Sequence, residues 1–310
     1  MPETPFGFWI FSPSLTFFGG ELEPLNEYAE RIRDVEASDR CADGWCYPPL
    51  VEVESVVSNR NVVVPVERFE LPSTHRIAAT EPWGDDEYLD FAIALAGMLC
   101  GMRLVREGWG HFHEIPIGST GVLADLHVRP FEIAEVLDAG SRWWSTASTI
   151  ERRRMFGAIH WLCFSVSYDY EFDAFAARYT VIDTLWSIHE SRTAVVGRAH
   201  AERPSILAAA YGLELPPWGV VTSSGRRKTC PLAELRNELI HEARFSGEPI
   251  GFAVPTEYEP SLSHQLSSFA MRLILSMLNV DAGFVGSSMS GMTRWLDLNR
   301  RSPTATAKAG

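Results

Sequence analysis

The sequence lacks any long uninterrupted hydrophobic run. Its longest apolar stretch, Phe91 to Met102, has twelve residues and is bounded by Asp90 and Arg103, whereas a transmembrane helix needs about twenty. The N-terminus also lacks the basic segment that opens a secretory signal peptide, and Ser12 and Pro13 interrupt its apolar residues. These absences argue against a membrane protein. We therefore expect a cytoplasmic protein with no membrane partner.

Cysteine is scarce. The chain of 310 residues has five, an odd number: Cys41, Cys46, Cys100, Cys163 and Cys230. This usage is typical of reduced thiols inside a cell. Cys41 and Cys46 could supply two metal ligands, but no second Cys or His pair follows at zinc-site spacing. We therefore expect no structural metal, and the sequence implies no cofactor.

Positive charge is also scarce, and it is unevenly distributed. Lys and Arg number 27 against 40 Asp and Glu, which gives a net charge of −13. Residues 1–150 hold 10 basic against 24 acidic residues, a difference of −14, and residues 151–310 hold 17 against 16, a difference of +1. Such a chain should not bind polyanions over its whole surface. Any nucleic-acid site must be local, and the near-neutral half suits it best.

The pattern of elements predicts an α+β protein with a β-rich first half. Short runs rich in Val, Phe and Ile, separated by Gly, Pro, Ser and Asn, predict strands at 6–11, 15–18, 51–57 and 62–69. Helices are expected at 26–37, at 85–107 up to Gly108, and at 130–139 up to Gly140. We place a domain boundary near 140–150. Residues 1–145 would form an acidic sensing or regulatory domain.

The second half predicts an all-α up-and-down bundle over residues 146–300. Apolar residues recur every three or four positions over 156–166 and 172–189, which is the pattern of two long amphipathic helices. Further helices are expected from Pro204 to Gly212, from Pro231 and from Ser261. Residues 213–231 are expected to form a loop, and 301–310 a disordered tail.

One helix of this half carries a set of residues suited to chemistry. With about 100° per residue, Asn237 and His241 lie about 40° apart on an α-helix, while Arg236 is turned about 140° from His241. Arginine can hold a phosphate through two parallel N–H donors, and histidine can move protons near neutral pH. Two facing copies of the helix would share a ligand most easily. The trio suits metal-free cleavage of an RNA phosphodiester.

The spacing alone is weak evidence, because Arg106 and His111 share it by chance. The competing interpretation is a solvated helix face on which Arg236 pairs with Glu238 or Glu242. The basic triplet Arg226, Arg227 and Lys228 precedes the motif helix. It is either a mobile exposed loop or a track for an RNA backbone.

The segments that flank the motif suggest a family. They are Ile159-His160-Trp161-Leu162, Tyr170-Glu171-Phe172-Asp173, Ile182-Asp183-Thr184-Leu185-Trp186, Pro216-Pro217-Trp218 and the stretch 247–252. Together with Arg236-Asn237-x-x-x-His241, residues 150–300 resemble the HEPN (higher eukaryotes and prokaryotes nucleotide-binding) superfamily, especially its Apea-like subgroup. The first 140 residues lie outside this resemblance.

The resemblance implies a bundle of four to five helices, often a homodimer, whose two motif helices form a composite site for metal-independent endoribonuclease activity. It implies prokaryotic antiphage defence by abortive infection, and it makes Arg236, Asn237 and His241 the active-site candidates. An acidic residue is common in the second helix at the position of Asp183, although Glu is more usual there. Asp183 is therefore a candidate supporting residue.

Two other functions remain open from the sequence. The bundle could be a non-catalytic module that dimerises or binds a nucleotide for an N-terminal recognition domain. Alternatively, His111, His113 and His127 could hold a metal in an N-terminal enzyme, since a His-x-His pair on a strand points to one side. If the bundle is a nuclease, we expect the N-terminal domain to restrain it until a trigger, phage-derived or other, binds there.

Overall fold

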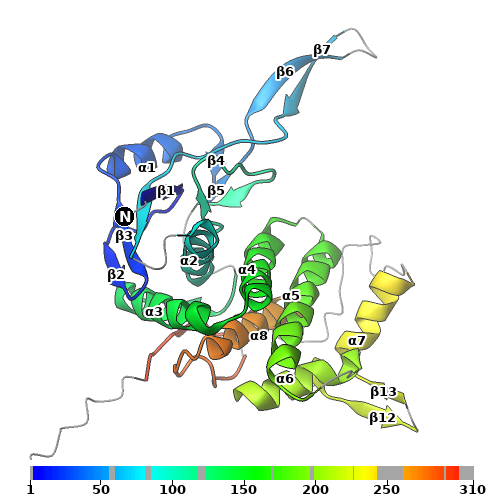
Figure 1. The fold of residues 1–310 in the computed structure, drawn as a ribbon. Coiled ribbons are helices and arrows are strands. Elements are labelled where there is room, and N and C mark those ends of the chain that lie inside the picture. The colour runs from blue at the N-terminus through cyan, green and yellow to red at the C-terminus, as the bar shows by residue number, and fades with distance from the viewer. Residues whose placement is uncertain are drawn as a thin grey trace, which may run out of the picture.

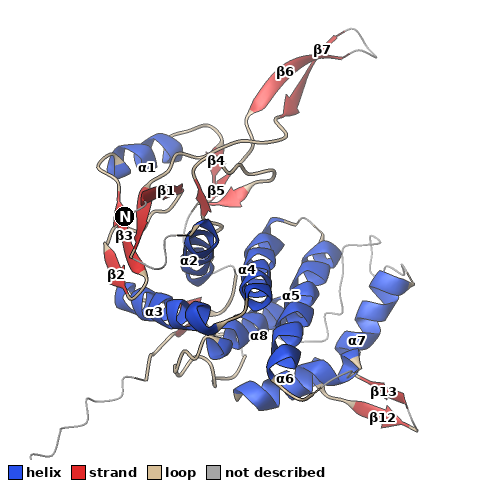
Figure 2. Ribbon diagram, in the orientation of Figure 1, coloured by secondary structure: helices blue, strands red, loops and turns tan. Residues whose placement is uncertain are grey.

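The computed structural model describes residues 3–55, 60–80, 85–117, 123–168, 170–195, 199–225, 227–242, 261–289 and 291–299. Three sequence features lie outside these ranges: Arg226, the stretch 247–252 and the predicted tail 301–310. The described chain is a mixed α+β protein with a β-rich N-terminal half and a helical C-terminal half (Figures 1 and 2). This coarse division confirms the prediction from the sequence.

The N-terminal half is organised around a five-stranded antiparallel sheet in the order β2-β3-β8-β1-β9. Its strands are β1 (Glu3–Gly7), β2 (Leu15–Phe17), β3 (Gly20–Pro24), β8 (His75–Ala79) and β9 (Val105–Arg106). Helix α1 (Tyr28–Glu36) follows β3, as the acidic segment 26–37 predicts. The side chains of Phe6, Leu22 and Ile77 on this sheet are fully buried. The sheet thus contributes one wall of the hydrophobic core.

Smaller sheets complete this half. A three-stranded sheet in the order β10-β5-β4 combines β4 (Cys41–Ala42), β5 (Trp45–Cys46) and β10 (Ile115–Pro116). Strands β6 (Leu50–Ser55) and β7 (Arg60–Pro65) form an exposed hairpin that projects from the body (Figure 1). Strands β11 (Leu126–His127) and β14 (Arg294–Trp295) pair in parallel. That pair connects the two halves, because β14 comes from the C-terminal end of the described chain.

Two helices of the first half have other bounds than the sequence predicts. Helix α2 (Asp86–Leu99) ends well before Gly108, because the chain turns at Gly101, which has a positive φ of 67°, and then enters β9. Helix α3 (Pro130–Thr146) continues through Gly140. A Cβ atom on Gly140 would come within 2.6 Å of the Leu95 side chain. This glycine therefore allows close packing of α3 on α2 and does not end the helix.

The helical half follows the predicted pattern more closely. Its long helices are α4 (Thr149–Phe164), α5 (Glu171–Arg192) and α8 (Leu262–Met277), and α6 (Arg203–Tyr211) ends at Gly212 in the left-handed conformation. Helix α7 (Pro231–Arg236) is short. The expected loop 213–231 instead contains the hairpin of β12 (Thr222–Ser224) and β13 (Arg227–Thr229). None of the described helices has the length and apolar character needed to cross a bilayer.

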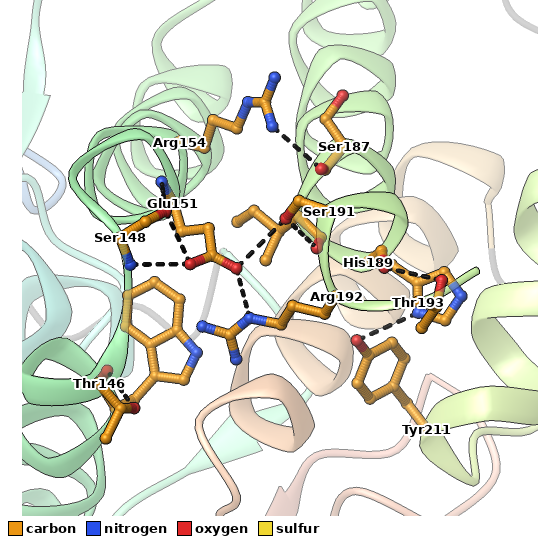
Figure 3. A network of polar contacts seen from close by, with 12 residues as sticks. Thr146, Ser148, Glu151, Arg154, Ser187, His189, Ser191, Arg192, Thr193 and Tyr211 are labelled. Carbon is orange, nitrogen blue, oxygen red and sulfur yellow. Dashed lines mark hydrogen bonds and ion pairs between the residues drawn. The ribbon is translucent and has the colours of Figure 1, made fainter. Parts of the chain in front are cut away.

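A polar network fixes the start of α4 against the end of α5 (Figure 3). Ser148 caps α4, and its N–H and hydroxyl both donate to Glu151 at 2.8 Å. The other Glu151 oxygen accepts from Arg192 Nε at 2.6 Å and from the Ser191 hydroxyl at 3.2 Å. Although partial burial opposes ionisation, these contacts lower the pKa of Glu151 to about 2. A charged Glu151 thus joins α4 to α5.

One hydrophobic core extends across residue 145. It includes Phe6 from the sheet, Phe91 from α2, Ile159 from α4 and Phe269 from α8. The boundary region is itself helical up to Thr146, and Trp143 and Trp144 are buried. The two halves therefore share a core, and their separation into independently folding domains stays a prediction.

Candidate functional site

Arg236, Asn237 and His241 lie where α7 continues into a π-helical turn, Asn237–His241. The Glu242 N–H donates to the Asn237 carbonyl oxygen at 3.1 Å, a hydrogen bond that spans five residues, as in a π-helix. The expectation of an uninterrupted α-helix, with Arg236 turned away from His241, is therefore wrong. The wider turn brings residues five apart in sequence to the same side, so one chain places Arg236 next to His241.

The three motif side chains contact one another. Arg236 Nη1 donates to Asn237 Oδ1 at 3.1 Å and also to His241 Nε2. Because a guanidinium has only donors, His241 Nε2 is the acceptor and carries no proton in this arrangement. Arg236 is half-buried, whereas His241 is exposed. The guanidinium and the exposed imidazole therefore lie together at one point, and Arg236 occupies the Nε2 lone pair.

Helix α5 contributes an aromatic ring that packs against Arg236. The guanidinium carbon of Arg236 lies 5.8 Å from the centre of the buried Tyr179 ring, a cation–π arrangement. The Tyr179 hydroxyl in turn hydrogen-bonds His200 Nδ1 at 2.9 Å. Burial raises the pKa of Tyr179 above its usual value, and the nearby Asp183 raises it further. Tyr179 is therefore a neutral hydroxyl that connects the motif to His200.

Asp183 lies one turn after Tyr179 on α5 and contacts a second arginine. Its Oδ1 accepts from Arg203 Nη1 at 2.8 Å and lies 3.5 Å from His200 Nδ1. Asp183 does not touch Arg236 or His241 directly, so its predicted supporting role can act only through His200 and Arg203. The site thus combines residues from α5, from the 3-10 turn that precedes α6, from α6 and from the end of α7. We call it the Arg236 cluster: Tyr179, Asp183, His200, Arg203, Arg236, Asn237 and His241.

The electrostatics of the cluster keep His200 neutral. Burial lowers the pKa of His200 below its usual value, and the nearby Arg203, Arg236 and His241 lower it further, against the opposing charge of Asp183. The cluster thus holds two arginines, and its one carboxylate, Asp183, pairs with Arg203. Among the residues that the structure describes, no carboxylate contacts Arg236.

Two donors in the cluster have no partner among the residues that the structure describes. Arg236 Nε and Arg203 Nε are buried and have no hydrogen-bond acceptor in the described part of the chain. A buried unpaired donor is costly, and such groups in native proteins commonly mark a place where water or a ligand binds. Together with the excess of positive charge, these donors suit an anion with several oxygens, such as a phosphate.

No family model, curated protein or solved structure matches this chain.

Two residues of the predicted basic triplet, Arg227 and Lys228, lie on the β12–β13 hairpin beside the cluster. Arg227 and Lys228 belong to β13, and the turn between the two strands includes Gly225 at a φ of 62°. The exposed Lys228 ammonium contacts Glu202 at 2.7 Å, two residues after His200. Lys228 is therefore engaged in an ion pair at the edge of the cluster, and an RNA backbone would have to compete with Glu202 for it.

The alternative metal site is not assembled. His111 is buried and its backbone pairs with Phe69, while the rings of His113 and His127 contact Phe164 and Trp295. Within the described ranges, no three His, Cys, Asp or Glu side chains come close enough together to hold a metal ion. His111, His113 and His127 therefore do not form the three-histidine site in the described structure.

Three members of the cluster were not predicted as site residues. Tyr179 fits the apolar pattern of α5, which gave no reason to assign it a polar role. His200 and Arg203 flank the start of α6, outside any helical periodicity shared with Arg236. The sequence has a His and an Arg just before Pro204, which marks a helix start, but this position gives no reason to place them beside α5. Only the packing of α6 beside α5 brings them to Asp183.

Proposed function

We propose that this protein is a metal-independent endoribonuclease whose helical half is a HEPN-like bundle and whose active site is the Arg236 cluster. The observation that carries the proposal is the direct contact between Arg236 and an unprotonated His241 Nε2, with a second arginine and unpaired N–H donors close by. Arg236 would bind the phosphate, and His241 Nε2 would accept the 2′-hydroxyl proton. Asn237 would orient the guanidinium that it contacts.

In the proposed reaction, the phosphate of the RNA takes the place that His241 now occupies on the Arg236 guanidinium. His241 then accepts the proton of the 2′-hydroxyl, whose oxygen attacks the adjacent phosphorus. The P–O5′ bond breaks, and His241 gives the proton that it accepted to the leaving 5′ oxygen. Arg236 stabilises the additional negative charge of the phosphorane. The products are a 2′,3′-cyclic phosphate and a 5′-hydroxyl end.

Asp183, His200 and Tyr179 are assigned as positioning residues. Asp183 neutralises Arg203, and the neutral His200 holds the hydroxyl of Tyr179, on whose ring Arg236 rests. This chain of contacts would fix Arg236 without giving it a carboxylate partner that competes with phosphate. We assign Arg226, Arg227 and Lys228 to the RNA backbone track at the rim of the site.

The proposal includes a biological setting. We infer a cytoplasmic homodimer formed through the bundle, which acts in prokaryotic antiphage defence after a trigger, phage-derived or other, binds the N-terminal half. The Arg236–His241 pair forms within one chain, so the dimer would combine two such pairs into a composite site. In Figure 1, α7 lies on the side of the molecule away from the five-stranded sheet. Restraint by the N-terminal half would therefore act through the shared core and would not cover the site.

The test is cleavage of total RNA by purified protein with chelator present. We expect His241→Ala to reduce the cleavage rate by about 100-fold to 10,000-fold, the usual contribution of a general base. The matched control is His113→Ala, because His113 is also exposed but lies outside the cluster. Equal cleavage by wild type and His241→Ala would contradict the assignment. RNA that is bound but left intact by every form would favour the non-catalytic module.

A further inference from the structure

A short hairpin in the N-terminal half places two cysteines opposite each other. Strands β4 and β5 pair antiparallel, with Cys41 aligned to Cys46 and Ala42 to Trp45. The turn between them consists of Asp43 and Gly44, with φ values of 51° and 81°. Two positive φ values in an Asp-Gly pair are typical of the type I′ turn that closes a two-residue hairpin. The pairing of the two cysteines is thus fixed by the turn.

The register gives the cysteine pair a geometry that allows a disulfide. On the far side of the pair from the turn, the Tyr47 N–H donates to the Arg40 carbonyl oxygen at 2.9 Å. Because hydrogen-bonded and non-hydrogen-bonded pairs alternate along antiparallel strands, Cys41 and Cys46 form a non-hydrogen-bonded pair, in which the Cα atoms are about 4.5 Å apart. A disulfide needs a Cα separation of about 4.4 to 6.8 Å. No backbone movement is therefore required for bond formation.

The two thiols differ in access and are already in contact. Cys41 is partly exposed, whereas Cys46 is fully buried among Phe8, Phe69 and other residues of a small second core. Burial, together with the hydrogen bond to the Cys41 thiol, raises the pKa of Cys46 to about 12. Cys41 is thus the sulfur that a reagent in solution can reach, and Cys46 is the neighbour that can respond. Cys100, Cys163 and Cys230 are buried, so they offer no comparable access.

We propose that Cys41 and Cys46 are a reversible dithiol–disulfide site that reacts with low-molecular-weight disulfides. The Cys41 thiolate attacks one sulfur of the small disulfide, forms a mixed disulfide and releases one small thiol. Cys46 then loses its proton, attacks the Cys41 sulfur and releases the second small thiol. The protein loses two electrons and two protons, and the small disulfide is reduced to two thiols.

The consequence of the bond is local. Strand β5 pairs with β10 on its other edge, and the chain after Cys46 leads through Pro48 and Pro49 into the projecting β6–β7 hairpin. A Cys41–Cys46 bond would link β4 to β5 covalently and hold the base of that hairpin. The reduced and oxidised proteins should therefore differ in stability around the small second core and not at the Arg236 cluster.

The experiment treats the folded full-length protein with oxidised glutathione, quenches it by alkylation and maps the cysteines by mass spectrometry. The expected result is that the peptide from Cys41 to Arg60 is lighter by two hydrogen atoms and takes up no alkyl group. The other three of the five cysteines stay alkylatable after unfolding, and a small reducing thiol reverses the change. A rise in the thermal midpoint should accompany oxidation.

The Cys41→Ser variant is the control, because its changed side chain is partly exposed and its fold should be retained. It should show neither the loss of hydrogen atoms nor the rise in thermal midpoint. Five alkylatable cysteines after oxidation of the wild type would overturn the proposal, as would a stable glutathione adduct on Cys41 without the internal bond. Both results are independent of RNA cleavage.

Discussion

Two arginines of the helical half differ in how completely the fold satisfies them. Arg272 on α8 is fully buried, and its guanidinium contacts both oxygens of Asp125 at 2.9 and 3.1 Å. Its Nε donates to the Phe284 carbonyl oxygen at 3.1 Å. Arg236 is half-buried, contacts a histidine and an amide, and keeps a buried Nε donor without a partner in the described chain.

The difference separates a structural arginine from one that is available to a ligand. Every direction around Arg272 is filled by protein, and its partner Asp125 comes from the first half of the chain, so the pair joins the two halves inside the shared core. Arg236 packs on the Tyr179 ring and has no anionic partner among the described residues. Its neighbours hold the guanidinium in place but do not neutralise its charge, so the charge is available to bind an anion.

The largest expected effect is at Arg272. Replacing it in Arg272→Met should lower the free energy of unfolding by about 3 to 5 kcal/mol, because Asp125 would stay buried without its partner. Chemical denaturation measures this. The double variant with Asp125→Asn should recover part of the loss. A loss below about 1 kcal/mol in the single variant would show that the buried pair does not join the halves.

The next effect concerns Arg236 and should fall on activity. Arg236→Ala should lose about 1.5 to 3 kcal/mol of transition-state stabilisation, the range for a hydrogen bond to a charged group. Its free energy of unfolding should change by less than about 1 kcal/mol. RNA cleavage rates and denaturation curves of the same preparations measure both. If Arg236→Ala destabilised the protein as much as Arg272→Met, the contrast between the two arginines would fail.

The smallest expected effect is a difference in acid sensitivity between the Arg236 cluster and the Arg272–Asp125 pair. Folding lowers the pKa of His200. Neutral His200 therefore stabilises the cluster fully at pH values above about 6.5, the pKa of histidine in the unfolded chain. This contribution to stability is lost as the pH falls through the lower pKa of the folded state. Burial opposes ionisation of Asp125, but contacts with Arg272 and Ser268 hold its pKa below the usual value. Stability from Asp125 is therefore retained until pH falls below about 3.8.

Hydrogen exchange, corrected for its intrinsic pH dependence, distinguishes these two windows. Between pH 7 and 5, peptides covering 199–211 and 231–242 should lose protection while 261–277 keeps it. Equal loss in all three peptides would indicate global unfolding instead of a local response of the cluster.

The sequence predicted the presence of helices and strands better than it predicted where they end or which of them contact one another. Apolar periodicity located α4, α5 and α8, because their buried faces repeat every three or four residues. It failed at Gly140, since a glycine that ends a helix and one that allows close helix packing look the same in one sequence. It also failed at Asn237, because no residue pattern distinguishes a π-turn from an α-turn.

The candidate site was predicted in part for a related reason. The sequence identified four residues of the site because each lies on a predicted helix, within a segment that resembles a known family: Asp183, Arg236, Asn237 and His241. His200 and Arg203 meet Asp183 only through the packing of α6 beside α5, and such contacts between distant segments leave no local signal.

The most direct test of the central claim is the chemistry of the RNA ends. A defined oligoribonucleotide is incubated with wild-type protein and chelator, and the product ends are identified. We expect 2′,3′-cyclic phosphate and 5′-hydroxyl ends, and no cleavage of a matching oligonucleotide in which every 2′-hydroxyl is absent. Products with 3′-hydroxyl and 5′-phosphate ends, or cleavage of the 2′-deoxy oligonucleotide, would contradict it.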